Sequence, residues 1–404
     1  MTAALAAAQR IAPDLVALRR RLHRIPEVGM DLPETQAVVL EALAGLDLEV
    51  TTGQSLSSVV AVLRGRAPHD GERPVVLLRG DMDGLPVAEE VDVDYVSQRP
   101  GAMHACGHDL HVAALVGAAR VLHELRDELV GDVVLMFQPG EEGPGGAEPM
   151  IREGLLEAAG RRVDAAYAVH VYSAEHPRGV WFGRPGPLMA AADEVRVVIH
   201  GKGGHGAAPE QAKDPVPVAC EVVLAFQTAV TRRFSIWDPV VLTVGRVAAG
   251  TKDNIIPDDA HVEATLRTFS REQRALAHEV VAQVADGVAA AHGMTADVVI
   301  ENGYPVTVND EAEFAFARGV VTDLFGAGRW ADMVNPEAGS EDMAFVLEEV
   351  PGAYLNVSAC AHEDLALAED NHSPRAAFDD SVVPDVAAAL AEMALRRSRM
   401  PVRD

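Results

Sequence analysis

The chain has 404 residues, of which 49% are hydrophobic and 24% are charged, so it can fill two ordinary domains. Its 61 acidic residues outnumber its 34 basic residues and give a formal net charge of −27. Such a surface repels a phosphate backbone and anionic lipid, which argues against nucleic-acid and membrane-surface partners.

The start of the chain and the cysteines predict a cellular compartment. No apolar run approaches the roughly 18 residues that a spanning helix needs. The start, MTAALAAAQRIAPDL, lacks the basic and apolar regions of a signal peptide. Cys106, Cys220 and Cys360 cannot form a disulfide framework, and an odd count is typical of a reducing compartment. We therefore expect a cytoplasmic protein, with Cys220 and Cys360 as core residues.

The first half alternates apolar runs with amphipathic stretches, which predicts an α/β fold around a mostly parallel sheet flanked by helices. The main helix is predicted at Asp109–Leu129, where apolar residues recur at helical spacing. The strands are continuously apolar, as expected when helices cover both faces of a sheet. They are predicted at Val59–Leu63, Val75–Arg79, Val133–Gln138 and Ala165–Val171.

From about Ala190 the order of the predicted elements changes. A strand at Glu194–His200 is followed by a helix at Pro215–Arg233 and by two strands at Val240–Val247 and Ala260–Thr268. A helix at Arg271–His292 and a strand at Ala296–Glu301 complete the set. This βαββαβ order is that of the ferredoxin-like split unit, which is complete in itself. We interpret it as a domain inserted into the first one.

After Pro305 the first pattern resumes. Two helices, a strand and a last helix are predicted at Glu311–Phe325, Glu341–Glu349, Ala353–Val357 and Asp380–Arg397. The predicted organisation is therefore a first domain made of residues 1–188 and 306–404, with residues 189–305 inserted.

The stretch Met103–His111, MHACGHDLH, concentrates three histidines and a cysteine just before the first predicted long helix. Cys106 and His108 flank Gly107, whose tight turn lets both side chains face one point. A thiolate together with an imidazole favours a transition metal over magnesium or calcium. His104, Asp109 and His111 either orient the ligands or serve packing, and the sequence leaves both roles open.

Further ligand candidates follow the other predicted strands. In open α/β sheets, ligands gather beyond the carboxyl ends of the strands. The polar residues at these ends are Asp81 and Asp83, Glu141 and Glu142, His170, and His372 in the loop after Ala353–Val357. They are too many for one tetrahedral ion, which indicates two ions that share the site.

The adjacent Glu141 and Glu142 indicate the reaction. Neighbouring residues in extended backbone point in opposite directions, so one carboxylate can bind metal while the other faces a metal-bound water. Such a water is acidified towards a pKa of about 7 and supplies a hydroxide nucleophile, whose proton the second carboxylate takes. The pattern therefore predicts metal-assisted hydrolysis of a carbonyl compound.

The motifs together resemble a known family, the amidohydrolase branch of the aminoacylase and carboxypeptidase-G-like dinuclear metallopeptidases. That branch includes hippurate hydrolases and hydrolases of indoleacetyl-amino-acid conjugates. The likeness covers nearly the whole chain, in order, and the match is highly specific. It is carried by Arg20–Gly29 (RRLHRIPEVG), Arg79–Pro86 (RGDMDGLP), Met103–His111, Phe137–Gly143 (FQPGEEG), Gly203–Gly206 (GGHG), Asn254–Pro257 (NIIP), Thr265–Thr268 (TLRT), Ser340–Asp342 (SED) and Asn371–Pro374 (NHSP).

The resemblance implies a role for each matching residue. The metal ligands would be Cys106, His108, Glu142, His170 and His372, with Cys106 between the two ions and Glu141 as the general base. Asp81 stands where the wider superfamily has a histidine ligand, so we treat Asp81 and Asp83 as supports behind the ligands. Gly80 and Glu210 also depart from the branch, which commonly has Ala and His there.

By the same likeness, the inserted domain would be a lid that also forms a homodimer or a higher homo-oligomer. An open four-stranded sheet leaves edges that need pairing, which agrees with this role. His205 resembles the family histidine that reaches a neighbouring subunit's site and steadies the developing oxyanion. Asn254 and Arg267 would hold the free carboxylate of a small-molecule substrate.

These observations predict a metal-dependent hydrolase that cuts the amide of N-acyl or N-aroyl amino acids. Two divalent ions per chain are expected, drawn from zinc, manganese, cobalt and nickel. One alternative is a dipeptidase or carboxypeptidase of the same fold. The other is a pseudoenzyme that binds such amides or metal without turnover, which would not need Glu141.

Overall fold

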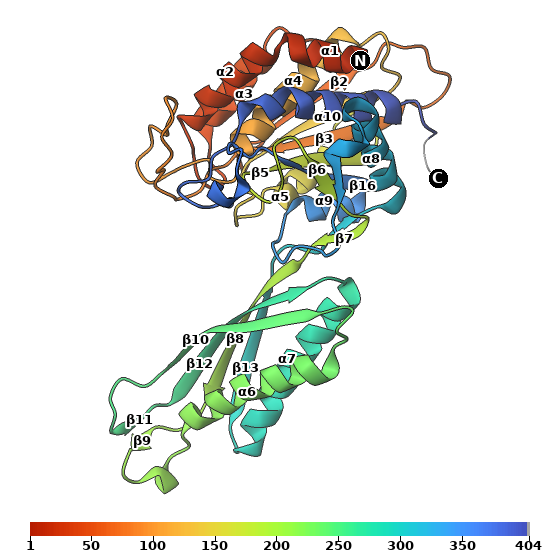
Figure 1. Ribbon diagram of the computed structural model, residues 1–404. Helices are drawn as coiled ribbons and strands as arrows, with labels where there is room; N and C mark the ends of the chain where they lie inside the picture. The colour runs from red at the N-terminus through yellow and green to blue at the C-terminus, as the bar shows by residue number, and fades with distance from the viewer. Residues whose placement is uncertain (402–404) are drawn as a thin grey trace. The chain divides into compact units, whose positions relative to one another are not determined.

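A computed structural model describes residues 1–401 and divides the chain into two compact units (Figure 1). The first unit contains Met1–Gly186, Val308–Val334 and the residues from Phe345 onward. The second contains Pro187–Thr307 and Asn335–Ala344. The sequence prediction put the boundaries at residues 188 and 305 and gave no part of residues 335–344 to the inserted domain. Among residues 1–401, no helix is long and apolar enough to cross a membrane.

The first unit is built on an eight-stranded sheet. Its central strands β4, β3, β5 and β16 pair with one another in parallel. The β1–β2, β2–β4 and β16–β6 pairs are antiparallel. Across the sheet the strands are β1 (Glu49–Thr52), β2 (Val59–Arg64), β4 (Asp132–Gln138), β3 (Val75–Asp81), β5 (Ala165–Tyr172), β16 (Gly352–Ser358), β6 (Trp181–Gly183) and β15 (Trp330–Asp332).

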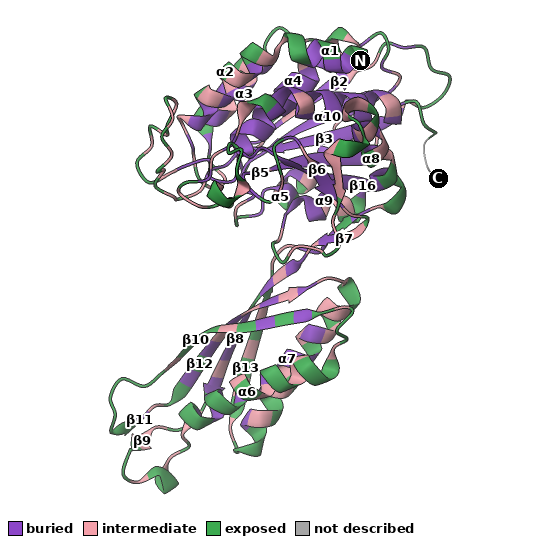
Figure 2. Ribbon diagram, in the orientation of Figure 1, coloured by how far each residue is buried: buried purple, intermediate pink, exposed green. Residues whose placement is uncertain are grey.

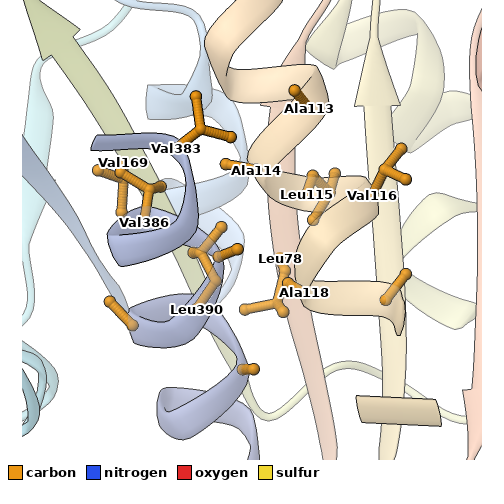
Figure 3. Close-up of a cluster of buried hydrophobic side chains, with 14 of the residues drawn as sticks. Leu78, Ala113, Ala114, Leu115, Val116, Ala118, Val169, Val383, Val386 and Leu390 are labelled. Carbon is orange, nitrogen blue, oxygen red and sulfur yellow. The ribbon is translucent and has the colours of Figure 1, made fainter. Parts of the chain in front are cut away.

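Helices cover this sheet and supply its core. Every residue of β3, β4 and β16 is buried, as expected for strands with both faces covered (Figure 2). Ala118 of α4 and Leu390 of α10 belong to the same buried cluster as Leu78 and Val169 of the sheet (Figure 3). The helices of this unit are α1 (Ala3–Arg10), α2 (Ala12–His23), α3 (Pro33–Leu43), α4 (His108–Glu124), α5 (Ala147–Arg152), α8 (Glu311–Phe325) and α10 (Val383–Arg397), and α9 (Met343–Glu349) spans its boundary.

A buried ion pair ties α8 and α10 to the sheet at the end away from the β5 carboxyl terminus. The Arg397 Nε atom lies 3.1 Å from both carboxylate oxygens of Glu313. The Tyr167 hydroxyl donates to Glu313 over 2.5 Å. Arg397 and Glu313 are each 1% exposed, so each charge depends on the other in the core.

The second unit is a four-stranded antiparallel sheet with two helices, in the order β8, α6, β10, β12, α7, β13. This is the predicted ferredoxin-like order. Buried and more exposed residues alternate along β8 and β12, because α6 and α7 cover only one face of this sheet (Figure 2). The bounds are β8 (Ala191–His200), α6 (Pro215–Arg233), β10 (Val240–Ala249), β12 (Asp259–Thr268), α7 (Arg271–Ala291) and β13 (Thr295–Asn302).

One core prediction in this unit is wrong. Cys220 is exposed on α6, whereas Cys360 in the first unit is buried. The buried side of α6 is the face of Val218, Val222 and Phe226, and Cys220 lies off that face. An apolar helix therefore did not reveal which of its sides would meet the sheet.

A short ribbon extends the second unit. It pairs β9 (Gly204–His205) with β11 (Ile255–Ile256), and His205 lies opposite Ile255. The chain passes from one unit to the other at β7 (Gly186–Met189) and β14 (Thr307–Asn309), and again before Asn335 and within α9.

Candidate metal centre

Four neighbouring strands of the first unit end beside the candidate ligands. Since β4, β3, β5 and β16 run parallel, their carboxyl ends lie at one edge of the sheet. Asp81 is the last residue of β3, Glu141 follows β4, His170 lies near the end of β5, and His372 lies in the loop after β16. The sheet therefore gathers side chains from four distant stretches of the chain.

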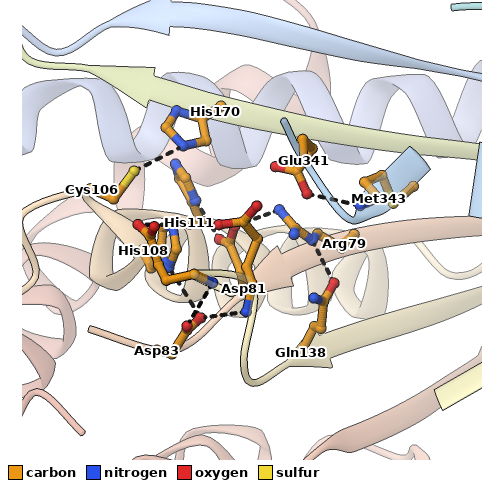
Figure 4. A network of polar contacts seen from close by, with 12 residues as sticks. Arg79, Asp81, Asp83, Cys106, His108, His111, Gln138, His170, Glu341 and Met343 are labelled. Atoms are coloured by element: carbon orange, nitrogen blue, oxygen red, sulfur yellow. Dashed lines mark hydrogen bonds and ion pairs between the residues drawn. The ribbon is translucent and has the colours of Figure 1, made fainter. Parts of the chain in front are cut away.

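Cys106 lies at the middle of this group. Next to it, Gly107 has φ +82° and comes so near Val171 that an added Cβ would lie 2.4 Å from Cγ2 of that valine. Only glycine fits this turn at the start of α4. The Cys106 Sγ atom lies 3.4 Å from Nε2 of His170 (Figure 4) and 3.3 Å from Nε2 of His372. The thiol is thus held between two imidazoles.

Two sets of possible ligands share Cys106. The atoms of each set lie within 4.8 Å of one another, and the sets are Cys106, His108 and His170, and Cys106, Glu142 and His372. His108 is fully buried, its Nδ1 atom lies 3.3 Å from Asp83, and its Nε2 atom makes no hydrogen bond. A buried polar atom without a hydrogen bond lowers the stability of the fold unless another partner, such as a metal ion, uses its lone pair. Because thiolate, imidazole and carboxylate suit transition metals, these residues fit two ions that share Cys106.

The paired glutamates lie in a turn, so the prediction of extended backbone here is wrong. Residues 141–144 are turn residues that follow Gly140, whose φ is +75°. Both carboxylates therefore approach His108, and one atom from each of the three residues lies within 4.8 Å of the others. Glu142 also lies 3.2 Å from Nε2 of His372. Glu141 is 7% exposed and belongs to neither of the two sets that share Cys106.

Asp81 is occupied by protein partners. Its carboxylate lies 2.5 Å from Nη1 of Arg79 and 2.5 Å from Nδ1 of His111 (Figure 4). Burial acts to raise the pKa of Asp81, but Arg79, and then His108 and His111, hold it well below its ordinary value. Asp81, His108 and His111 are also close enough to form a set. Because Arg79 and His111 already satisfy Asp81, we do not interpret it as a ligand.

Asp83 contacts three residues of the candidate metal centre. Its two oxygens accept the backbone N–H groups of Glu141 and Glu142, over 3.1 and 3.0 Å. The same carboxylate lies 3.3 Å from Nδ1 of His108. One buried aspartate thus orients the glutamate turn and the histidine together.

The remaining polar residues of the MHACGHDLH loop have different partners. Asp109 lies 2.8 Å from Nε of Arg19 and 2.8 Å from Nδ1 of His23, which fastens the first turn of α4 to α2. Burial acts to lower the pKa of His23, but Asp109 and then Glu89 raise it overall. His104 is buried, and neither of its ring nitrogens is hydrogen-bonded.

Sequence reasoning assigned no role to Arg79, Arg19 or His23. The signal for Arg79 was present, because it stands two positions before Asp81 on β3 and so shares its face. Arg19 and His23 gave no such signal, because their partner Asp109 lies far away in the sequence.

Three predicted substrate residues belong to the second unit. Asn254 lies beside His205 in the β9–β11 ribbon, where the Asn254 carbonyl accepts the N–H of Gly206 over 3.0 Å. Arg267 is near the other end of β12, and its Nη1 lies 3.2 Å from Oγ of Ser340. The strand between Asp259 and Arg267 spans roughly 27 Å at the usual rise per residue. Asn254 and Arg267 therefore lie far apart within one chain.

Ionisation before metal binds follows from these contacts. Burial raises the pKa of the Cys106 thiol, and the Glu142 carboxylate raises it further. Hydrogen bonds with Cys106 and Glu142 raise the pKa of His372 to about 10. Both shifts favour the protonated forms of these two groups when no metal is bound.

Comparisons with known proteins cover nearly the whole chain. Residues 77–396 match the model of peptidase family M20/M25/M40. The chain is 35% identical to thermostable carboxypeptidase 2 of Saccharolobus solfataricus, over 95% of each protein. It is 36% identical to IAA-amino acid hydrolase ILR1-like 2 of Arabidopsis thaliana, over 95% of this chain and 84% of that protein. The Bacillus subtilis YXEP protein, a dinuclear metal-binding peptidase from the M20 family, has a crystal structure that matches with a TM-score of 0.82 and 30% identity, over 97% of this chain and 100% of that one.

Metal binding should release protons. We expect metal-stripped protein to take up two Zn²⁺ or Mn²⁺ ions per chain and to expel at least the protons of Cys106 and His372. The apparent affinity should then rise with pH, by about tenfold per unit for each proton released, because protons compete for the same atoms. Calorimetric titration between pH 6 and 8, in buffers of different ionisation enthalpy, measures both quantities. Binding that is independent of pH, or active protein without a transition metal, would contradict the assignment.

Proposed function

Because the chain belongs to peptidase family M20/M25/M40, we propose that it cuts the amide bond of N-acyl or N-aroyl amino acids, such as hippurate-like, N-acetyl or indoleacetyl conjugates. The family resemblance, the α/β fold class and the two-ion centre expected from the sequence are confirmed, and the protein is a metal-dependent hydrolase. The observation that carries the choice of substrate is the identity with the IAA-amino acid hydrolase along 95% of the chain.

We assign Cys106, His108 and His170 to one ion, and Cys106, Glu142 and His372 to the other. This assignment rests on the two sets of close ligand atoms and on the position of the thiol between two imidazoles. When bound, such ions polarise a carbonyl oxygen and acidify an attacking water. The protein contributes the fixed geometry, which Asp83 maintains behind Glu142 and His108.

Glu141 is the proposed general base. Its carboxylate lies within 4.8 Å of ligand atoms of His108 and Glu142, yet Glu142 is the glutamate that joins Cys106. Glu141 can therefore take a proton from the attacking water and return it to the departing amine. Asp83 holds its backbone in place by accepting the Glu141 N–H.

The substrate carboxylate is assigned to Arg267 and Asn254. Since the stretch of β12 between them, from Asp259 to Arg267, alone spans roughly 27 Å, one carboxylate can meet both only if they come from different subunits. This supports a homodimer formed through the second unit, in which Asn254 and His205 act together in the partner's site. The Ala207 N–H donates to Nδ1 of His205 over 3.0 Å, so the neutral ring carries its proton on Nε2. That N–H is a suitable oxyanion donor.

A carboxypeptidase or dipeptidase activity is the second candidate, favoured by the 35% identity with thermostable carboxypeptidase 2. Both kinds of substrate have a free carboxylate next to the scissile amide, so the metal centre and Arg267 would serve either. They differ in the group on the other side of the amide, which is an acyl group in one and an amino acid in the other.

A substrate screen tests the proposal. We expect the metal-loaded protein to hydrolyse N-acetyl, N-benzoyl or indoleacetyl amino acids faster than dipeptides with the same C-terminal residue. The matching C-terminal amides should react poorly, because Arg267 and Asn254 would lose their charged partner. Product analysis by chromatography measures each rate. Preference for dipeptides would favour the second candidate, and equal rates on acids and amides would remove Arg267 and Asn254 from the substrate site.

The paired glutamates should give different defects. Glu141→Gln should keep both ions and lower kcat by about 10²–10⁴-fold, because the base is lost. Glu142→Gln should instead weaken metal binding. Turnover and metal content of the two variants, purified side by side, distinguish the roles, and reversed behaviour would show that they have been exchanged.

Subunit mixing tests the role of His205. His205→Ala and Glu141→Gln should each be nearly inactive alone, whereas an exchanged mixture should recover about a quarter of full activity, since half the dimers contain one intact site. Glu141→Gln mixed with Glu142→Gln is the control, because two defects of the first unit cannot complement each other in this way. Absence of recovery, with exchange verified by a mass-tagged subunit, would place His205 outside the partner's site.

A further inference from the structure

His111 has no nitrogen left for a metal ion. The backbone N–H of Val171 donates to its Nε2 atom over 2.9 Å, so Nε2 acts as an acceptor. The proton of the neutral ring is therefore on Nδ1, which donates to Asp81 over 2.5 Å. His111 is buried, so neither bond is replaced by water. It connects a helix to a strand rather than acting as a ligand.

The bond to Val171 is made where the sheet cannot make one. On the β3 side, β5 pairs from Ala165 to Ala168, opposite Val76 to Arg79, and this ladder ends there. The Val171 N–H lies beyond the ladder and is buried, so it needs another acceptor. The imidazole of His111 supplies that acceptor. It thereby fixes the end of β5 at the residue next to His170.

The opposite side of His111 is fixed equally firmly. Asp81 binds Nδ1 of His111 with one oxygen and Nη1 of Arg79 with the other, each over 2.5 Å. The Arg79 Nε atom donates to Gln138 at the end of β4 over 3.0 Å. Arg79 and Asp81 have side chains that are at most 1% exposed. The chain of bonds therefore runs from β4 through β3 and α4 to β5.

α4 lies close to β3 at this point. A Cβ atom added to Gly80 would lie 3.0 Å from the carbonyl oxygen of His111 and 3.3 Å from Cβ of Leu115. A side chain there would push the helix away by a few tenths of an ångström. The same helix carries His108 one turn earlier, and the ring centroids of His108 and His111 are 5.4 Å apart. The ring of His111 also lies 4.8 Å from that of His170.

We propose that Arg79, Asp81 and His111 form a positioning relay that fixes the distance between His170 and the Cys106–His108 turn. The relay acts on one ion, because His170 and His108 belong to only one of the two ligand sets, whereas Cys106 belongs to both. The set that contains Glu142 and His372 is held by other contacts. Asp83 accepts the backbone N–H of Glu142, and the backbone N–H of His372 donates to the Ala105 carbonyl over 2.8 Å. The inference rests on the ligand assignment of the proposed function.

Two substitutions separate the two bonds of His111. The amide nitrogen of His111→Asn stands near Nδ1, so it keeps a donor for Asp81 and loses the acceptor for Val171. The amide oxygen of His111→Gln stands near Nε2, so it keeps the acceptor and loses the donor. Since the acceptor fixes β5, His111→Asn should have the larger effect, and His111→Gln should partly restore the site.

Titration of metal-stripped protein with Co²⁺, followed by visible absorption against a competing chelator, measures the affinity of each ion. His111→Asn should lower the affinity for one ion by about 10–100-fold, which is the usual effect of losing a residue that holds a metal ligand in place. The affinity for the other ion should stay as in the unaltered protein. Asp81→Asn should weaken the same ion and provides the test if His111→Asn does not fold. Tyr167→Phe is the matched control, because it removes a buried bond from the same strand at its far end and should leave both ions unchanged.

The outcomes separate this inference from the proposed function. Unchanged binding of both ions in the His111 variants, equal weakening of both ions, or an equal loss in Tyr167→Phe would overturn the relay. Unaltered protein that binds two ions but hydrolyses no N-acyl amino acid would overturn the proposed function and leave the relay intact.

Discussion

The main constraint on this structure is that histidines, carboxylates and one thiol gather at the edge of an apolar sheet, where most of them are buried and only His372 of the two ligand sets is exposed. Buried polar groups must be paired, and buried charges must be neutralised. Cys106 meets this demand by lying 3.3–3.4 Å from two imidazoles that come from β5 and from the loop after β16. The closeness of these residues depends on the parallel order of the central strands, which brings their carboxyl ends together. The site is therefore a consequence of the sheet.

The acidic residues around the centre have two different kinds of partner. Asp81 and Asp109 lie against the guanidinium groups of Arg79 and Arg19, so protein cations neutralise them. Glu142 instead faces imidazoles that can give up their protons, and Cys106 is a thiol that can do the same. Metal ions can replace those protons but not the arginines. Asp81 and Asp109, which pair with arginines, therefore hold the site together, whereas Glu142 and Cys106 can bind ions.

The two units place different demands on their sequences. The strands of the first unit are covered on both faces and are continuously apolar, which leaves function to the strand ends. The strands of the second unit alternate, because helices cover only one face. The second unit also holds His205 and Asn254 in its ribbon and Arg267 near the far end of β12. This spacing is the reason for the proposal that two subunits complete the substrate site.

The sequence by itself determined the α/β class, the ferredoxin-like order and the stretches that carry the candidate ligands, because periodicity and residue type are local properties. It missed the short strands β1, β6 and β15, which have too few residues to show a period. It also failed for the turn at Glu141 and the exposed side of Cys220, since backbone direction and helix facing depend on packing. Only the tertiary structure decided that Asp81 belongs to Arg79 and His111, and that His111 binds the Val171 N–H. The two pairings of His111 join residues that are 30 and 60 positions apart in the chain, and the packing of α4 across β3 and β5 brings them together.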